Sequence, residues 1–217
     1  MTILSTKILS LHQQELLLNT GLGLVHYNAL TVELLTTPQN QVFAKNLVIT
    51  SQNASYALNA LKPDEHAIYC VGSKTAQQVA SRGFKVAHVA INAIALAQHL
   101  ISSPSAATGY TYLCGTDRRE ELPMALLASK IDFKEVKVYR TNMVERRYRR
   151  IFAAVLCYSP RGVIAYAKAN LKQTKCAICI GTTTATEAQN YFEKVVTATI
   201  PTIENTIITA YKALQHD

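Results

Sequence analysis

One segment of the chain occurs twice, with a spacing of about 109 residues. In each copy an apolar, strand-like run leads to a small hydroxyl residue, and the next such run leads to a Gly-x-x-Thr-Ala turn. The first copy comprises Val48–Ser51 and Tyr69–Ala76, and the second comprises Leu156–Ser159 and Cys179–Ala185. This spacing is too long for a solenoid unit and suits two copies of one α/β domain. We therefore expect two similar lobes with a ligand-binding cleft between them.

Short apolar runs alternate along the chain with longer amphipathic stretches, which is the rhythm of βαβ units and parallel sheets. The expected strands are 2–6, 23–27, 47–50, 68–71, 86–89, 110–114, 135–139, 153–158, 177–180 and 194–197. The expected helices are 9–20, 52–61, 74–82, 93–102, 119–129, 160–169, 184–192 and 202–214. The fold class is thus α/β, with flavodoxin-like or Rossmann-like lobes.

The repeat also predicts where one lobe gives way to the other. The ten expected strands divide five and five between the lobes if the N-terminal strands belong to the same lobe as the second copy of the repeat. One lobe then spans 36–138, and the other combines 1–30 with 142–217. Connecting strands at 31–36 and 136–142 would join the lobes side by side as a two-stranded connector.

Composition narrows the class of protein. Of 217 residues, 49% are hydrophobic and 17% are charged, which is typical of a folded globular chain. No apolar run approaches the roughly 20 residues that a membrane-spanning helix needs. Met1–Lys7 lacks the charged and apolar pattern of a secretory signal, so we expect a cytoplasmic location.

The sequence predicts no metal and no cofactor. Four cysteines (Cys70, Cys114, Cys157 and Cys179) lie in strand-like runs, where small thiols pack well, although Cys176-x-x-Cys179 leaves redox or metal chemistry as an alternative. The six histidines have no metal-ligand spacing. Nucleotide-binding glycine motifs and a Gly-x-Ser-x-Gly nucleophile motif are both absent from the sequence.

A net charge of +8 keeps nucleic acid, an anionic membrane and a polyanionic small molecule open as partners. The densest basic run is Arg146-Arg147-Tyr148-Arg149-Arg150. Such a run is most often a solvated helix face. An anion-binding patch at the mouth of the cleft and a nucleic-acid contact are the alternatives.

Hydroxyl residues and glycines at the strand-to-helix junctions could bind anions. In a parallel sheet these helix starts share the carboxyl-terminal edge, and their first N–H groups point outward. Gly72 and Gly181 would leave room for a ligand to approach the backbone. Taken singly, each junction is explained by ordinary helix capping, as at Ser159-Pro160. The recurrence of the set in both copies favours a site for several carboxylates or phosphates.

An ordered set of short motifs resembles the uroporphyrinogen-III synthase family. The matching segments are Ile49–Ser51, Val71–Ala76, Leu113–Pro123, Val138–Thr141, Tyr158–Val163 and Ile180–Ala185. The resemblance implies two α/β lobes joined by a two-stranded connector. It also implies that the substrate is hydroxymethylbilane, a linear tetrapyrrole rich in carboxylates. Closure with inversion of the last pyrrole ring and loss of water would give uroporphyrinogen III.

The resemblance also implies roles for particular residues. The carboxylates of the substrate would bind around Ser51, Gly72, Ser73, Thr75, Ser159, Gly181, Thr183 and Thr184. Tyr139 would donate a hydrogen bond to the departing hydroxyl group, although a packed connector aromatic explains it equally well. Lys175 would add charge at the cleft, or be an ordinary surface lysine.

A cleft within one chain makes a monomer sufficient. The resemblance further implies a protein that binds neither nucleic acid nor a membrane and contacts hydroxymethylbilane synthase transiently. Two departures from the family pattern are visible. Ser5-Thr6-Lys7 replaces Thr-Arg-Pro, and the stretch from Thr141 to Ser159 is short. The alternative function is a non-catalytic two-lobed module that binds polyanions, although Tyr139 and both Gly-x-x-Thr-Ala turns argue against it.

Overall fold

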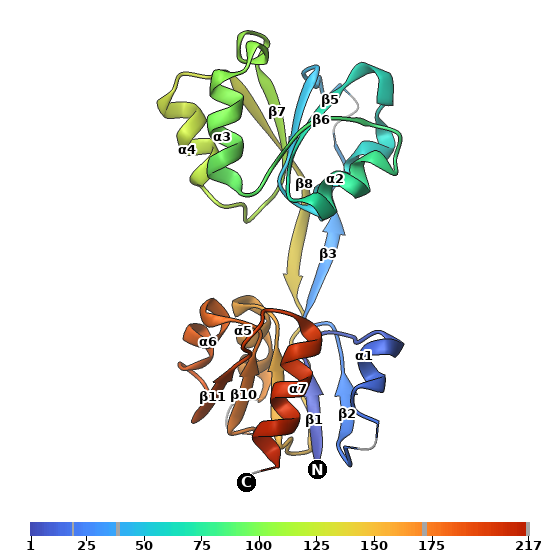
Figure 1. Cartoon of the computed structure of the whole chain (residues 1–217), viewed down its shortest axis with the longest axis vertical. Coiled ribbons are helices and arrows are strands. Elements are labelled where there is room, and N and C mark those ends of the chain that lie inside the picture. The colour runs from blue at the N-terminus through green and yellow to red at the C-terminus, as the bar shows by residue number, and fades with distance from the viewer. Residues whose placement is uncertain (19, 38–39, 171–172, 216–217) are drawn as a thin grey trace. The chain divides into compact units, whose positions relative to one another are not determined.

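The computed structural model describes residues 1–18, 20–37, 40–170 and 173–215 of the chain. The chain forms two compact units (Figure 1). The discontinuous unit comprises Met1–Thr31 and Asn142–Asp217, and the central unit comprises Val32–Thr141. Each unit contains one sheet whose strands alternate along the chain with helices, so the predicted α/β class is confirmed.

The discontinuous unit is built on a five-stranded sheet in the order β11-β10-β9-β1-β2, with every pair parallel. Its strands are β1 (Thr2–Ser5), β2 (Gly23–His26), β9 (Ala154–Cys157), β10 (Cys176–Cys179) and β11 (Lys194–Thr197). Its helices are α1 (Leu11–Glu15), α5 (Pro160–Asn170), α6 (Thr182–Ala188) and α7 (Ile203–Leu214).

The central unit contains a six-stranded sheet in the order β3-β8-β7-β4-β5-β6. Its strands are β3 (Leu30–Leu34), β4 (Asn46–Ile49), β5 (Ala67–Val71), β6 (Lys85–Ala90), β7 (Tyr110–Gly115) and β8 (Phe133–Met143). Its α-helices are α2 (Ser73–Ala80), α3 (Ala93–Ser102) and α4 (Glu121–Ala128). Its 3-10 helices are η1 (Gln52–Ala60), η2 (Pro63–Glu65) and η3 (Pro104–Thr108).

The two sheets have the same strand plan. In the central unit β4, β5 and β6 run outward in one direction, and β7 and β8 follow on the other side of β4. In the discontinuous unit β9, β10 and β11 run outward, and β1 and β2 follow on the other side of β9. The N-terminal strand β1 therefore occupies the place that β7 has in the other sheet. In an open α/β sheet, ligands bind where the strand order reverses, which here is between β4 and β7 and between β9 and β1.

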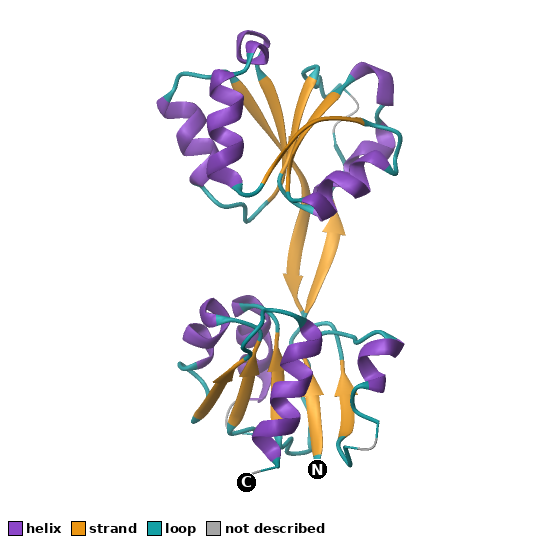
Figure 2. Ribbon diagram, in the orientation of Figure 1, coloured by secondary structure: helices purple, strands orange, loops and turns teal. Residues whose placement is uncertain are grey.

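Helices cover both faces of each sheet, so the inner strands β4, β7, β9 and β10 are buried on both sides (Figure 2). Along β4, Leu47 and Ile49 pack into one apolar cluster and Val48 into the cluster on the opposite face. Double burial explains why these strands are continuous apolar runs in the sequence. All five cysteines are free and buried, which confirms the predicted buried thiols. None of the described helices is long and apolar enough to cross a membrane.

Candidate active site

Two helices begin at equivalent positions of the repeat. α2 starts directly after Gly72, and α6 starts directly after Gly181. Neither glycine offers a side-chain acceptor to the first helical turn. The first N–H groups of both helices are therefore without a side-chain cap, and they carry the positive end of the helix dipole. Such helix starts suit anionic ligands.

The two glycines differ in backbone conformation, but both leave space for a ligand. Gly72 has a φ of 80°, which L side chains rarely adopt, whereas Gly181 has an ordinary extended φ of −172°. A Cβ added at either position would meet no heavy atom within 4 Å. The room that we predicted beside both glycines is present, but the backbone requires glycine only at Gly72.

The hydroxyl residues at these helix starts divide into exposed and buried ones. Ser73 and Thr183 are exposed. Thr75 and Thr184 are only 5% and 4% exposed. Both threonines therefore belong largely to the interior of their own units, and Ser73 and Thr183 present their hydroxyls at the surface.

The two serines of the repeat both act as helix caps. The Ser51 hydroxyl accepts a hydrogen bond from the N–H of Asn53 at 3.2 Å, before η1. The Ser159 hydroxyl accepts one from the N–H of Gly162 at 3.1 Å, in the first turn of α5. Ordinary capping thus occupies one acceptor position of each hydroxyl, as the sequence suggested for Ser159.

Tyr139 lies on β8, where its half-buried ring covers the end of β7. A Cβ on Gly115 would come within 2.7 Å of Tyr139 Cζ, so the ring rests directly on the glycine backbone. The pairing of β7 with β8 shifts register at this point, between Cys114 and Gly115. The N–H of Thr116 then donates to the Tyr139 carbonyl oxygen at 3.0 Å. A glycine and an irregular register therefore fix the position of Tyr139.

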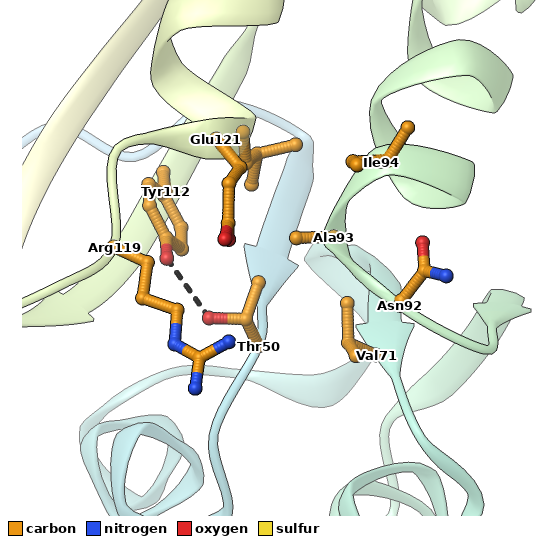
Figure 3. A pocket seen from close by; sticks show the side chains of 9 residues that line it. Thr50, Val71, Asn92, Ala93, Ile94, Tyr112, Arg119 and Glu121 are labelled. Carbon is orange, nitrogen blue, oxygen red and sulfur yellow. Dashed lines mark hydrogen bonds between the residues drawn. The ribbon is translucent and has the colours of Figure 1, made fainter. Parts of the chain in front are cut away.

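A cavity of about 330 Å³ opens at the carboxyl-terminal edge of the central sheet. It lies where the strand order reverses between β4 and β7. Its lining residues are Thr50, Val71, Asn92, Ala93, Ile94, Tyr112, Arg119, Glu121 and Leu122. Figure 3 shows the polar ends of Thr50, Tyr112, Arg119 and Glu121 gathered on one side, facing Val71, Ala93, Ile94 and the amide of Asn92. The cavity therefore has one polar wall and one wall that is apolar apart from Asn92.

The polar wall is organised by a pair of hydroxyl groups. Thr50 Oγ1 and the Tyr112 hydroxyl oxygen lie 2.8 Å apart, and either oxygen can be the donor. Only 3% of Tyr112 is exposed. Burial raises the pKa of Tyr112 to about 12, although the Thr50 hydrogen bond and the charge of Arg118 act in the opposite direction. The Tyr112 hydroxyl therefore keeps its proton at neutral pH.

Two neighbouring arginines at this edge serve different purposes. Arg118 pairs with Glu120 at 2.6 Å and with Glu135 at 2.5 Å, and only 16% of its side chain is exposed. Arg119 is exposed and forms an ion pair with none of the residues that the structure describes. Arg118 is thus committed to the fold, and the guanidinium of Arg119 is left for a ligand at the cavity.

Lys175 does not lie with the predicted site residues of its own unit. It precedes β10, whereas Gly181 follows the opposite end of that strand. Lys175 is exposed and pairs with Glu193 at 3.4 Å. Since the two ends of a parallel strand lie at opposite edges of the sheet, Lys175 is at the amino-terminal edge, away from the helix starts.

The arginine run 146–150 forms no helix, contrary to the expected helix face. The guanidinium of Arg146 lies 5.4 Å from the ring centre of Tyr148, and that of Arg150 lies 5.8 Å from the ring centre of Phe152. Arg150 also donates to Thr2 Oγ1 at 2.9 Å. These two arginines therefore cover aromatic side chains at the edge of the discontinuous unit's core.

Comparisons with known proteins identify the family. The family model of uroporphyrinogen-III synthase HemD matches residues 25–208. The fold is similar to a solved uroporphyrinogen-III synthetase from Helicobacter pylori, with a TM-score of 0.69 and 18% identity over 100% of this chain and 99% of that one. It is also similar to a mutant uroporphyrinogen III synthase from Thermus thermophilus, with a TM-score of 0.64 and 13% identity over 100% and 99% of the two chains. Among curated proteins, no sequence matches this chain.

The two structural likenesses are below 25% identity and therefore describe the fold alone. The family model, by contrast, spans most of the chain, including both Gly-x-x-Thr-Ala turns, Tyr139 and the residues of the cavity. The chain belongs to the uroporphyrinogen-III synthase HemD family.

Proposed function

We propose that the chain converts hydroxymethylbilane into uroporphyrinogen III within tetrapyrrole biosynthesis, as a lyase that closes the ring with loss of water. The observation that carries this proposal is the family match over residues 25–208. The structure supports it with open, positively polarised helix starts at Gly72 and Gly181, where carboxylate groups of the substrate would bind.

The reaction begins with cleavage of the bond between the terminal hydroxymethyl carbon and its oxygen. The oxygen leaves as water, and the pyrrole becomes an electrophilic azafulvene. The substituted carbon of the last ring attacks it to give a spiro intermediate. That intermediate fragments and recombines at the other α-carbon of the inverted ring, which then loses a proton. The overall balance is the loss of one water molecule.

In our proposal, catalysis consists mainly of holding one substrate conformation. Hydroxymethylbilane closes unaided to the isomer without inversion, so the enzyme must favour attack from the substituted carbon. Main-chain N–H groups together with the exposed hydroxyls of Ser73 and Thr183 would hold the carboxylates. Thr75, Thr184, Ser51 and Ser159 would support these helix starts from within their own units.

Tyr139 is proposed to donate a hydrogen bond to the departing oxygen. The Gly115 backbone and the shifted register between β7 and β8 support this role, because they fix the position of the ring. Proton donation of this kind contributes roughly 100- to 10,000-fold at most to a rate. We further propose that the chain works as a cytoplasmic monomer that receives its substrate through transient contact with hydroxymethylbilane synthase.

An isomer assay tests the proposed function. Hydroxymethylbilane is generated in the presence of the purified chain, the products are oxidised, and uroporphyrins I and III are separated. We expect isomer III to predominate. Isomer I alone, from protein whose circular dichroism shows that it is folded, would overturn the proposal. The non-catalytic module that binds polyanions would then be the better account.

A further inference from the structure

The polar wall of the cavity between β4 and β7 has an uncommitted hydrogen-bond donor. The hydroxyls of Thr50 and Tyr112 carry two protons in total and share one hydrogen bond. Whichever oxygen donates in that bond, the other hydroxyl still has a proton to give. Neither hydroxyl has a further partner among the described residues. A ligand acceptor in the cavity would satisfy this proton.

Arg119 adds a second donor beside the hydroxyl pair, and Glu121 adds an acceptor (Figure 3). A guanidinium presents N–H groups in a planar fork that matches a carboxylate. The oxygens of Glu121 would accept an N–H from the ligand. A ligand with a carboxylate at one end and an N–H group nearby therefore matches the polar wall.

The opposite wall and the size of the cavity restrict the ligand further. Val71, Ala93 and Ile94 offer an apolar surface to a flat ring. Asn92 lies beside them, and its side-chain oxygen is used in capping α3, where it accepts from the N–H of Ala95 at 2.8 Å. The volume of about 330 Å³ is at the low end of the range for small-molecule sites, roughly 300–1,000 Å³. This is room for one substituted ring and not for a chain of four.

We propose that this cavity binds a single pyrrole ring of the substrate, with Arg119 and the spare hydroxyl proton of the Thr50–Tyr112 pair holding a carboxylate arm and Glu121 accepting the pyrrole N–H. This inference rests on the proposed function for the identity of the whole substrate. Binding of an acidic pyrrole in this cavity, by contrast, follows from the arrangement of the cavity residues alone.

Binding of a monopyrrole that carries one acetate and one propionate arm tests the cavity without turnover. In an amide NMR titration of the full chain, we expect shifts at Val71, Ala93 and Leu122, which line the cavity from three different elements. The N-methyl analogue cannot donate to Glu121, so we expect it to bind about tenfold more weakly. Equal affinity of the two probes, or shifts confined to other residues, would overturn the assignment.

Kinetics of substituted chains test the same cavity during turnover. Arg119→Ala should raise the KM for hydroxymethylbilane by about tenfold or more while kcat stays within about twofold, because it removes binding that is uniform through the reaction. Arg119→Lys keeps the charge but not the fork, and we expect it to restore only part of the affinity. Lys134→Ala is the matched control: it removes one exposed cation from the start of β8, at the opposite edge of the same sheet.

The outcomes separate this inference from the proposed function. Isomer III from the unsubstituted chain together with an unchanged KM in Arg119→Ala would reject the pyrrole site and leave the synthase function standing. Isomer I alone together with monopyrrole shifts at the cavity would reject the synthase function and keep the pyrrole site. Should Arg119→Ala fail to fold, the titration of the unsubstituted chain still decides the matter.

Discussion

At Gly181 the extended backbone has no need of glycine, and the open space beside it would accept a methyl group. We therefore expect Gly181→Ala to leave the free energy of unfolding within about 0.5 kcal/mol of the original. The KM should nevertheless rise, because the methyl group stands where a carboxylate would approach the first turn of α6. Urea unfolding and steady-state kinetics measure the two quantities. An unchanged KM would place the carboxylates elsewhere.

Gly72→Ala is the contrasting substitution at the equivalent position. The φ of 80° at Gly72 is strained for any L side chain, so we expect the alanine variant to lose about 1–3 kcal/mol in the free energy of unfolding. The comparison of the two alanine variants separates backbone strain from obstruction of the ligand. Equal stability of both variants would contradict the conformational argument.

Tyr139 and Gly115 should act as one unit. Tyr139→Phe is expected to lower kcat with little loss of stability, since only a hydroxyl is removed. Gly115→Ala would place a methyl group 2.7 Å from Tyr139 Cζ and displace the ring, so it should lower kcat as well. If both act through the hydroxyl position, the double variant will be no slower than the slower single variant. Fully additive losses would show that Gly115 does not work through Tyr139.

Tyr112 should make the stability of the chain depend on alkaline pH. Its folded pKa of about 12 exceeds the ordinary value of 10.0 because burial disfavours the phenolate. The resulting stabilisation is fully present below pH 10 and is lost as pH rises through 12. The shift corresponds to roughly 2–3 kcal/mol. Urea unfolding between pH 9 and 12 should show a smaller fall for Tyr112→Phe than for the original chain. An equal fall would show that Tyr112 does not carry this dependence.

At the scale of elements, burial decides what a threonine in a first helical turn can do. Thr75 and Thr184 are almost fully buried, whereas Ser73 and Thr183 are exposed. Thr75→Ala and Thr184→Ala are therefore expected to lower the free energy of unfolding by about 1 kcal/mol with a small change in KM. Ser73→Ala and Thr183→Ala should instead raise the KM with little change in the free energy of unfolding. Loss of substrate affinity in the first pair alone would restore the role suggested by the sequence.

Most elements were predictable because double burial gives strands a continuous apolar sequence. β3 was not expected as part of the central sheet, since four of its five residues are exposed and it carries no apolar run. The helix expected over 52–61 is the 3-10 helix η1, and that over 9–20 shortens to α1. Propensity alone does not distinguish these cases, because packing decides them.

The cavity was not predictable for a different reason. Thr50 and Arg119 stand in motifs that the sequence shows, but Tyr112 lies in the middle of an apolar run. The three side chains converge only because β7 pairs with β4, which places residues distant in sequence at one sheet edge. Sequence spacing revealed the repeated helix starts, whereas the strand order was needed to reveal this site.

On the scale of the whole molecule, the repeat relates the two units by a permutation of the chain. In the central unit one continuous segment runs from β4 to β8. In the discontinuous unit the equivalent strands β9, β10 and β11 come last, and β1 and β2 come first. The chain passes between the units twice, near Thr31 and near Thr141. The central unit is therefore an insertion into the other unit.

An insertion with its own core should be removable. The apolar clusters of each unit contain residues of that unit alone. The N–H of Val144 donates to the carbonyl oxygen of Ala29 at 2.9 Å, so the two segments of the discontinuous unit lie side by side at the junction. We expect 30–143 to fold alone, and 1–29 joined to 144–217 by a short glycine linker to fold as well.

Each fragment should show native-like circular dichroism and a single cooperative urea transition, because domains of roughly 100 residues usually unfold in two states. The two fragments mixed should yield only uroporphyrin I, since the proposed carboxylate contacts at Gly72 and Gly181 belong to different fragments, and a substrate that binds two separate molecules pays the entropic cost of association twice. A fragment that remains unfolded would show that its core depends on the other unit. Isomer III from the mixture would show instead that the covalent connection between the units is dispensable for the reaction.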